Sequence, residues 1–320
     1  MSEEWRLLAD IGGTNARFAL QRPGGPAERI AVLPSHDYDG LAAAAAAYLK
    51  QLGDAPPIAR AAVCVAGPVI GDHLALTNAP WRFSIEETRR ALGLAQLRVV
   101  NDFVAVALAV PHLDPSVLAQ IGGRRAEGRA PIVVLGAGTG LGVCGLVPDP
   151  RGAGWLPVPG EGGHATLAGT SEREDAVFAR IRARYGHCSG ERVVSGSGLV
   201  NVYEAIAALD GRTVGPVEPA DVTRMAAEGD PLADEAVEIF CCAAGTVAGN
   251  LALIFTALGG VYLAGGIIRL LGERFRRSRF RERLEAKGRF RDLLATVPAY
   301  QITEGFSAMI GLAALLDGEW

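Results

Sequence analysis

The sequence contains almost no lysine and no paired cysteine motif. Only two of its 320 residues are lysine, Lys50 and Lys287, and neither follows a glycine. A P-loop or a protein-kinase site, each of which depends on a lysine, is therefore excluded. The five cysteines form no CxxC pair and no even-numbered set. This usage favours a reducing compartment over a secreted, disulfide-bonded protein, and we expect the protein to be cytoplasmic.

The sequence also has no excess of positive charge, and its first residues do not have the pattern of a signal peptide. It opens with the acidic stretch "MSEEWR", with no basic segment before an apolar one, so we expect no signal peptide. The net charge of −4 and the pI near 5.8 give no general attraction to nucleic acid or to an anionic membrane. Residues 269–292 hold nine arginines among four acidic residues. We interpret this segment as a solvated helical face, and we expect no nucleic-acid partner.

One long stretch, Phe240 to Ile268, carries no charge at all. It is long enough to cross a bilayer. However, Gly, Asn and Thr are scattered through it, and the pair Gly259-Gly260 divides it into two shorter apolar segments. This pattern favours a buried helix followed by a buried strand, and we expect no membrane partner.

Short apolar strands alternate with helical patterns along the first part of the chain, which indicates an α/β domain with a mixed sheet. The motif "SIEE" at Ser84 predicts a helix that begins with a capping box in which Glu87 returns to the cap. The other expected elements are a strand, turn and strand at Leu7–Gln21, strands at Ile30–Pro34, Ala61–Ala66 and Leu74–Thr77, a helix at Leu41–Leu52, and the strand "LRVVND" followed by the helix "FVAVALAV".

A second segment of similar layout follows the Gly- and Arg-rich loop near residues 122–131. The stretch "PIVVLGAGTGLGVCGLV" is again strand, glycine-rich turn and strand, which suggests a duplicated unit. A second capping box, "SERE" at Ser171, opens a helix through Tyr185. We expect two α/β lobes with a cleft between them: a smaller domain of residues 1–112 together with the C-terminal segment 303–320, and a larger domain of residues 113–302.

The two glycine turns are the first chemical signal. Glycines permit a positive φ and close approach of a ligand, and successive N–H groups can form a concavity for an anion. Asp10 could hold a magnesium ion through water, and Thr14, Asn15 and Thr139 offer short donors. The alternative is two ordinary hairpin turns. "GAGTGLG" does not match GxGxxG in either register, so the dinucleotide fingerprint is absent.

The second signal is "VVNDF", where Asn101 and Asp102 stand between a strand and a helix. Open α/β sheets bind ligands at this kind of position. Asp102 could accept a proton from a substrate hydroxyl while Asn101 orients it. The alternative is that Asp102 only caps the helix.

The third signal lies in the loops "PGEGGHATL" and "GERVVSG". Glu161, His164 and Glu191 are suited to hydrogen-bonding a polyhydroxylated ligand. A metal site is the alternative, but His187 and Cys188 have no second spaced pair.

Several motifs, in order over nearly the whole chain, carry a resemblance. They are "ADIGGTNARFAL", "LTNAPWRFSI", "VVNDFVAVALAVPHL", "GAGTGLGV", "PGEGGHATL", "GERVVSGSGLVNVY", "GNLAL" and "GGVYLAGGI". The set resembles the bacterial glucokinase family of the proteobacterial type, within the hexokinase and actin-like ATPase superfamily. The resemblance implies an α/β fold of two ribonuclease H-like domains, with ATP, Mg²⁺ and glucose meeting in the interdomain cleft. It also implies a homodimer.

The resemblance further implies roles for single residues. Asp102 is the general base, and Asp10 is linked through water to Mg²⁺. The implied sugar ligands are Asn101, Asp102, Glu161, His164 and Glu191, with Asn78 as a further candidate. The implied nucleotide contacts are Asp10, Ile11, Gly12, Gly13, Thr14, Asn15, Gly136, Gly138, Thr139, Gly140, Gly265 and Gly266. The family pattern has a proline where this sequence has Ser197. This difference affects only the expected stiffness of the local loop.

Three alternatives share the fold. A ROK-family kinase of broader hexose specificity usually carries a cysteine-rich zinc motif, and no cysteine occurs here between Cys144 and Cys188. A sugar-sensing repressor needs a DNA-binding headpiece, for which the first glycine loop lies too near Met1. A chaperone-like or filament-forming relative hydrolyses ATP without sugar and does not need Glu161, His164 and Glu191.

Overall fold

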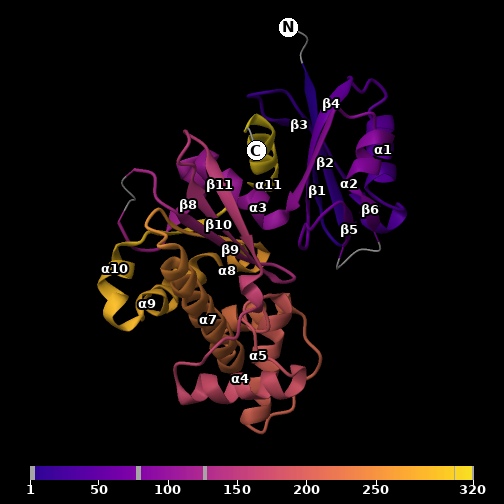
Figure 1. Cartoon of the computed structure of the whole chain (residues 1–320). Coiled ribbons are helices and arrows are strands. Elements are labelled where there is room, and N and C mark those ends of the chain that lie inside the picture. The colour runs from indigo at the N-terminus through magenta and orange to yellow at the C-terminus, as the bar shows by residue number, and fades with distance from the viewer. Residues whose placement is uncertain (1–3, 77–80, 125–127, 306, 319–320) are drawn as a thin grey trace. The chain divides into compact units, whose positions relative to one another are not determined.

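The computed structural model describes residues 4–76, 81–124, 128–305 and 307–318. The chain divides into two compact units, which we call unit 1 (residues 1–113 and 306–320) and unit 2 (residues 114–305) (Figure 1). The division falls one residue after the first boundary expected from the sequence and three residues after the second.

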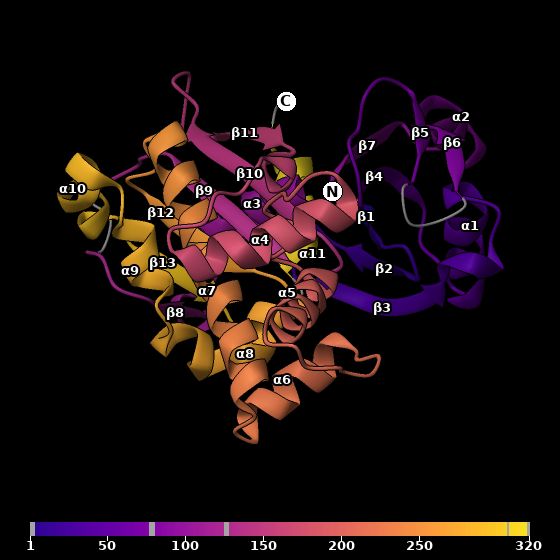
Figure 2. The ribbon, with the colours of Figure 1, turned by 90° about the horizontal axis from the view of Figure 1, so that it is seen from below.

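Unit 1 is built on a five-stranded mixed sheet in the order β3-β2-β1-β4-β7 (Figure 2). Strand β1 is antiparallel to β2 and parallel to β4, which is parallel to β7. The carboxyl ends of β1, β4 and β7 therefore lie along one edge of the sheet, and they carry the chain into its loops. The strand bounds are β1 (Trp5–Ile11), β2 (Asn15–Gln21), β3 (Ala27–Pro34), β4 (Ile58–Val65) and β7 (Gln96–Asn101).

Helices cover both faces of this sheet. The side chains of Leu7, Ala9 and Ile11 pack with α1 (Leu41–Gln51) and α2 (Ile85–Ala91). On the other face lie α3 (Asp102–Ala109) and the C-terminal α11 (Ser307–Asp317), which pack against each other (Figure 1). They approach so closely that a Cβ on Gly311 would lie 1.7 Å from the Ala105 carbonyl oxygen. The shorter elements are η1 (Ser35–Asp37), β5 (His73–Ala75), β6 (Arg82–Ser84) and η2 (Val110–His112).

Unit 2 contains a six-stranded sheet in the order β11-β10-β9-β12-β13-β8. It repeats the pattern of unit 1, because the first strand of a hairpin, β9, pairs in parallel with a later strand, β12. The two units therefore share this strand arrangement, as the expected duplication predicts. The strand bounds are β8 (Leu118–Gln120), β9 (Ile132–Ala137), β10 (Leu141–Pro148), β11 (Trp155–Gly160), β12 (Gly260–Ala264) and β13 (Ala299–Ile302).

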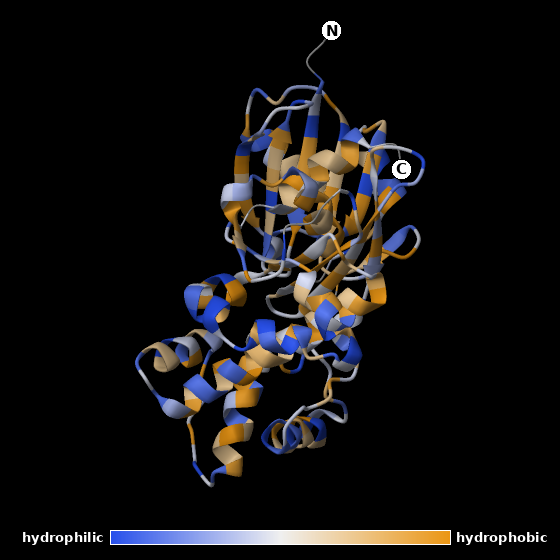
Figure 3. Cartoon of the chain, turned by 90° about the vertical axis from the view of Figure 1, so that its left-hand side faces the viewer, coloured by the Kyte–Doolittle hydropathy of each residue, from blue (hydrophilic) through white to orange (hydrophobic). Residues whose placement is uncertain are grey.

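Most of the longer helices of unit 2 have one face against its core and the other toward solvent, and in Figure 3 many helices carry both blue and orange segments. Their bounds are η3 (Pro115–Val117), η4 (Gly162–His164), α4 (Glu172–Tyr185), α5 (Gly196–Leu209), α6 (Pro219–Ala227), α7 (Pro231–Phe255), α8 (Gly266–Arg277), α9 (Phe280–Glu285), η5 (Gly288–Phe290) and α10 (Arg291–Thr296).

The long uncharged stretch is a core helix followed by a core strand, as expected. Among the described residues, α7 is the one helix long and apolar enough to cross a membrane, and 78% of its most apolar window is buried within the protein. It ends where Thr256 adopts a left-handed conformation, with φ of 47°. Strand β12 then begins at Gly260.

The two expected capping boxes are each only half formed. Ser84 and Ser171 accept hydrogen bonds from the N–H groups of Glu87 and Glu174, as expected. The return bonds are not made within the described part of the chain. Asp72 accepts hydrogen bonds from the Ser84 hydroxyl and the Glu86 N–H instead, while the Glu174 carboxylate turns toward Arg283.

The arginine-rich segment 269–292 is largely the solvated face that the sequence indicated. Most of its arginines pair with acidic side chains, which leaves little unbalanced positive charge. Two arginines depart from the interpretation, because Arg281 is mostly buried and Arg283 almost completely so. The pairs are Arg274 with Asp234 and Glu238, Arg276 and Arg277 with Glu273, Arg279 with Glu282, Arg281 with Glu285, and Arg283 with Glu174.

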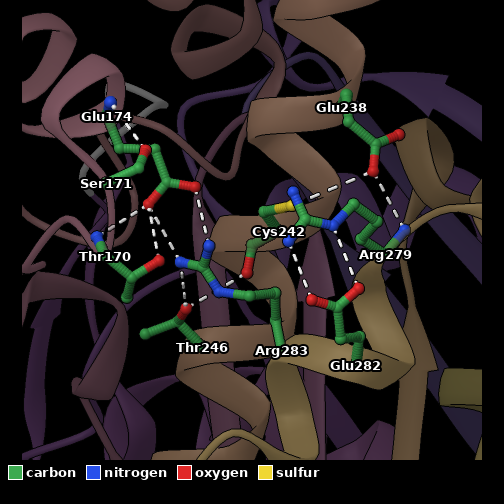
Figure 4. Close-up of polar contacts among 9 residues, drawn as sticks. All are labelled: Thr170, Ser171, Glu174, Glu238, Cys242, Thr246, Arg279, Glu282 and Arg283. Carbon is green, nitrogen blue, oxygen red and sulfur yellow. Dashed lines mark hydrogen bonds and ion pairs between the residues drawn. The ribbon is translucent and has the colours of Figure 1, made fainter.

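Arg283 belongs to a buried polar network that ties α9 to α4 and α7 (Figure 4). Its guanidinium donates to both oxygens of Glu174, at 2.8 and 2.9 Å, and to the hydroxyl of Thr246 at 3.2 Å. Glu174 also accepts from the N–H and hydroxyl of Thr170. Both charged side chains are less than 10% exposed. Because all these partners are needed to offset desolvation, losing one should cost more than losing an exposed pair.

We expect Arg283→Met to lower the free energy of unfolding by about 3–5 kcal/mol, because it leaves a buried carboxylate without its cation. The exposed arginine Arg277, whose partner is Glu273, is the matched control, and Arg277→Met should change stability little. Urea denaturation of both variants measures the difference. Equal effects of the two substitutions would contradict the buried role.

The same pair predicts a dependence on pH. Burial alone raises the pKa of the Glu174 carboxyl, but hydrogen bonds from Arg283 and Thr170 outweigh it and hold the pKa below its ordinary value of 4.5. The pair's contribution to stability is therefore complete above that pH and is lost as the pH falls further. The stability difference between wild type and Glu174→Gln should shrink between about pH 6 and about pH 3 in urea titrations. A constant difference would contradict this.

Candidate functional site

The first glycine loop, residues 12–14, connects β1 to β2 in unit 1. It is closed by a hydrogen bond from the Gly12 N–H to the Asn15 carbonyl at 2.9 Å. Gly12 does not adopt the positive φ that glycine permits, and a Cβ on it would lie 3.3 Å from the Asn15 carbonyl oxygen, a tight contact. In the described part of the chain, the N–H groups of Gly13 and Thr14 donate to no other residue. Two adjacent donors of this kind suit an anion.

Asp10 stands at the end of β1, and about a quarter of its side chain is exposed. One carboxylate oxygen lies 3.1 Å from Arg17 Nη1, and the other accepts a hydrogen bond from the Cys64 thiol at 3.4 Å. The described residues contain no cluster of three or more His, Cys, Asp or Glu that could hold a metal ion. Since both oxygens already have protein partners, Asp10 fits a magnesium ion that arrives with phosphate and contacts the protein through water.

Asn101 and Asp102 follow β7 at the start of α3. The side-chain oxygen of Asn101 accepts from the Phe103 N–H at 2.8 Å, and its amide donates to the Gly67 carbonyl at 3.0 Å. Asn101 is therefore the N-cap of α3. In the alternative interpretation of the sequence, Asp102 had that role. One oxygen of Asp102 also accepts from the Phe103 N–H, at 2.9 Å.

Asp10 and Asp102 lie near one buried thiol. Burial raises the pKa of Cys64 well above its ordinary value, and the negative charges of Asp10 and Asp102 raise it further. Cys64 therefore stays protonated at neutral pH and donates to Asp10. Its position follows from the register, because Cys64 on β4 pairs with Asp10 on β1 and Val100 on β7. The structure thus brings two of the predicted carboxylates to the same edge of the sheet.

Asn78 lies outside the described residues. The flanking residues place its segment between β5 and β6, where the Leu76 N–H donates to the Trp81 carbonyl at 3.1 Å.

The second glycine loop, residues 138–140, connects β9 to β10 in unit 2. The Gly138 N–H donates to the Gly140 carbonyl at 2.9 Å, while the Leu141 N–H donates to the Glu191 carboxylate at 3.0 Å. Here too neither glycine adopts the positive φ that glycine permits. A Cβ on Gly140 would lie 2.4 Å from Glu191 Oε2, so a side chain there would displace the Glu191 carboxylate. Among the described residues, no hydrogen bond is donated by the N–H of Thr139 or Gly140.

Gly265 and Gly266 lie at the same edge of this sheet. Strands β9 and β12 are parallel and pair Gly136 with Ala264, so the loops that follow them are neighbours. Gly265 has a φ of 101°, and a Cβ on it would lie 2.2 Å from the Ala137 carbonyl oxygen. The N-terminus of α5 joins this edge, since the Gly196 N–H donates to the Gly138 carbonyl. The proposed nucleotide residues of unit 2 are therefore brought together.

Glu161, His164 and Glu191 also come together in unit 2. His164 Nε2 lies 3.9 Å from Glu161 Oε2, and its Nδ1 lies 3.9 Å from Glu191 Oε1. The turn η4 places His164, and it packs so tightly that a Cβ on Gly163 would lie 2.0 Å from the Leu141 oxygen. More than half of each of the Glu161 and His164 side chains is exposed. The cluster thus offers acceptors and an imidazole to a ligand with several hydroxyls.

Among the described residues, His187 and Cys188 belong to no group of three or more potential metal ligands. The ring of His187 is hydrogen-bonded to the Thr166 hydroxyl at 2.8 Å. Cys188 is buried, and burial raises its pKa to about 11.

The sequence reasoning missed two features. Arg17 is the cross-strand partner of Asp10, a pairing that the short hairpin between them could have indicated. A cavity of about 370 Å³ lies between α6, α7 and α8, where its lining includes Ala227, Leu270 and Arg274. No local motif marks this cavity, because three successive helices form it together.

Comparison with known proteins gives a consistent match. A family model described as Glucokinase matches residues 7–319. The glucokinase of Paramagnetospirillum magneticum is 50% identical over 311 residues, 97% of each chain. The "Bifunctional protein glk" of Paraburkholderia xenovorans is 47% identical over 97% of this chain, which spans only 48% of that protein.

Solved structures show the same fold. A glucokinase from an Antarctic psychrotroph superposes with a TM-score of 0.88, at 35% identity over 99% of both chains. A ROK-family glucokinase from Streptomyces griseus, in complex with glucose and AMPPNP, has a TM-score of 0.67 at 21% identity, covering 98% of this chain and 100% of that chain. The α/β fold of the actin-like ATPase type predicted from the sequence is confirmed. The chain belongs to the glucokinase family.

Proposed function

We propose that this protein transfers the γ-phosphoryl group of ATP to the 6-hydroxyl of D-glucose, giving glucose 6-phosphate. The observation that carries the proposal is the 50% identity to a glucokinase over 97% of both chains. The donor is supported by the related ROK glucokinase, which was crystallised with glucose and an ATP analogue. The two glycine loops and the clustered polar side chains are chemically suited to these substrates.

On the nucleotide side, we assign the phosphates to the two glycine loops. In unit 2 the N–H groups of Thr139 and Gly140 face no acceptor within the described chain, and the ribose is assigned to Gly265 and Gly266 beside them. The cavity of about 370 Å³ is lined by Leu270 and Leu271 of α8, the helix that begins at Gly266. This apolar wall suits the adenine ring. In unit 1 the corresponding residues are Asp10, Ile11, Gly12, Gly13, Thr14 and Asn15.

On the sugar side, we assign hydroxyl contacts to residues of both units. In unit 2, His164 between Glu161 and Glu191 offers a donor and acceptors to adjacent hydroxyls. In unit 1, Asn101 retains one amide hydrogen and one oxygen lone pair beyond the bonds that it makes to the protein. Asn78 is a further candidate on the same side.

Asp102 is the proposed general base. Asp102 is the first residue of α3, and its carboxylate accepts a hydrogen bond from the Phe103 N–H. In the proposed step, the 6-hydroxyl oxygen of the sugar attacks the γ-phosphorus in line, and Asp102 accepts the proton that this hydroxyl loses. Mg²⁺ bound to the nucleotide would neutralise charge on the β- and γ-phosphates. Asp10 would orient water around that ion, while Arg17 and Cys64 hold its carboxylate. Backbone N–H groups supply the remaining stabilisation, since the chain has only two lysines.

We expect Asp102→Asn to lower kcat by about 10²–10⁴-fold, because the amide keeps the shape but cannot accept the proton. Glucose binding, measured by calorimetry, should persist. Asp114→Asn is the matched control, because Asp114 caps a short helix of unit 2 through the Ser116 N–H and has no role in the reaction. Wild-type turnover in Asp102→Asn would refute the assignment of the base.

We further expect ATP consumption to require a hexose, with glucose turned over fastest in a coupled assay with Mg²⁺. This follows because the clustered Glu161, His164 and Glu191 serve sugar hydroxyls in the proposal. ATP consumption that is equally fast without sugar would favour the chaperone-like alternative. Another hexose far ahead of glucose would overturn the substrate assignment and favour the broader-specificity, ROK-like one.

Two further expectations accompany the proposal: that two chains form a homodimer and that the protein acts in the cytoplasm. The burial of α7 within unit 2 and the pairing of the arginines in 269–292 agree with a protein that needs neither membrane nor nucleic acid. Both expectations stay predictions.

A further inference from the structure

We propose that Ser35 is a positioning residue for the first glycine loop and that it links this loop to the hairpin that carries Asn78. The proposal rests on the proposed function, because it assumes that the loop binds phosphate. Ser35 opens the short helix η1, directly after β3. All of the contacts that carry the argument lie within unit 1.

Ser35 holds both ends of the loop. Its N–H donates to the Thr14 carbonyl at 2.8 Å, and its hydroxyl donates to the Gly12 carbonyl at 3.0 Å. The residue is completely buried, with no exposed surface. Solvent therefore does not compete for these two bonds.

These bonds determine where the loop's N–H groups point. A trans peptide unit is planar, so its C=O and N–H point in opposite directions. When Ser35 holds the Gly12 carbonyl, the Gly13 N–H of the same peptide unit must point away from Ser35. That N–H donates to no residue in the described part of the chain. Ser35 thus turns a flexible glycine loop toward an anion without touching the anion itself.

Ser35 is in turn held by Trp81. The indole N–H of Trp81 donates to the carbonyls of Ser35 and Tyr38, each at 2.8 Å, and the side chain is fully buried. The Trp81 carbonyl accepts from the Leu76 N–H at 3.1 Å and closes the base of the hairpin between β5 and β6. A continuous set of hydrogen bonds thus leads from the first glycine loop to Leu76 and Trp81, which flank the segment that contains the sugar-side candidate Asn78.

Ser35→Ala tests the inference with a split between the two substrates. Losing the hydroxyl frees the Gly12 carbonyl, so we expect the KM for MgATP to rise about 3- to 10-fold. The KM for glucose should change by less than about twofold, because the proposed contacts between the protein and the sugar remain. Calorimetry with an ATP analogue in the absence of glucose should show the same loss of affinity, independently of turnover.

Ser84→Ala is the matched control. Ser84 is also a buried serine of unit 1. Its hydroxyl accepts a hydrogen bond from the Glu87 N–H and donates one to Asp72, and neither partner belongs to the glycine loop. It should leave the KM for MgATP unchanged although it weakens the cap of α2. Ser35→Cys keeps a weaker donor of similar size and should give an intermediate ATP affinity. It also serves as the test if Ser35→Ala does not fold.

The outcomes separate the two levels of the proposal. Wild-type ATP affinity in Ser35→Ala, or equal losses in Ser35→Ala and Ser84→Ala, would overturn the positioning role while the wild type still phosphorylates glucose. A wild type that neither binds the ATP analogue nor phosphorylates glucose would instead overturn the proposed function.

Discussion

The candidate site depends on the close approach of backbone at the carboxyl edges of parallel strands. In unit 2, β9 and β12 run side by side, and the loops that follow them can meet only because Gly265 carries no Cβ against the Ala137 carbonyl. In the same way, the absence of a Cβ on Gly140 leaves room for the Glu191 carboxylate, and its absence on Gly163 leaves room for the Leu141 carbonyl. A side chain at any of these positions would separate groups that the proposed chemistry needs together.

Unit 1 uses the same topology with different chemistry. Its hairpin pairs through β1 with β4, just as the β9-β10 hairpin pairs through β9 with β12. This topology places Asp10 and the Asn101-Asp102 pair at one edge. In unit 1 the candidate site residues are held mainly by charge and hydrogen bonds rather than by close packing around glycines. Arg17 and Cys64 hold Asp10, Asn101 caps α3, and Ser35 aims the loop. In the proposed reaction, each unit of the duplicated fold supplies one glycine loop for phosphate, and unit 1 also supplies the general base.

Much of this arrangement could be predicted from local sequence, and the failures have physical reasons. The strand, turn and strand patterns revealed both glycine loops, and the uncharged stretch was correctly interpreted as core helix and strand. The cap of α3 is Asn101 and not Asp102, the alternative that the sequence had left open, because which of two adjacent side chains caps a helix depends on backbone angles that composition does not encode. Arg283 looked like surface because its partner Glu174 lies 109 residues away. The contacts of Ser35 likewise join separate segments, and the cavity beside α8 depends on how three successive helices pack.

The central claim is that this chain phosphorylates glucose at its 6-hydroxyl with ATP as donor. The most direct measurement is ³¹P and ¹³C NMR of the product formed from glucose, ATP and Mg²⁺ by the purified protein. The account predicts a single phosphate ester whose coupling falls on C6, with one ADP formed for each ester. Phosphate on another carbon, or ADP with inorganic phosphate and no sugar ester, would contradict it.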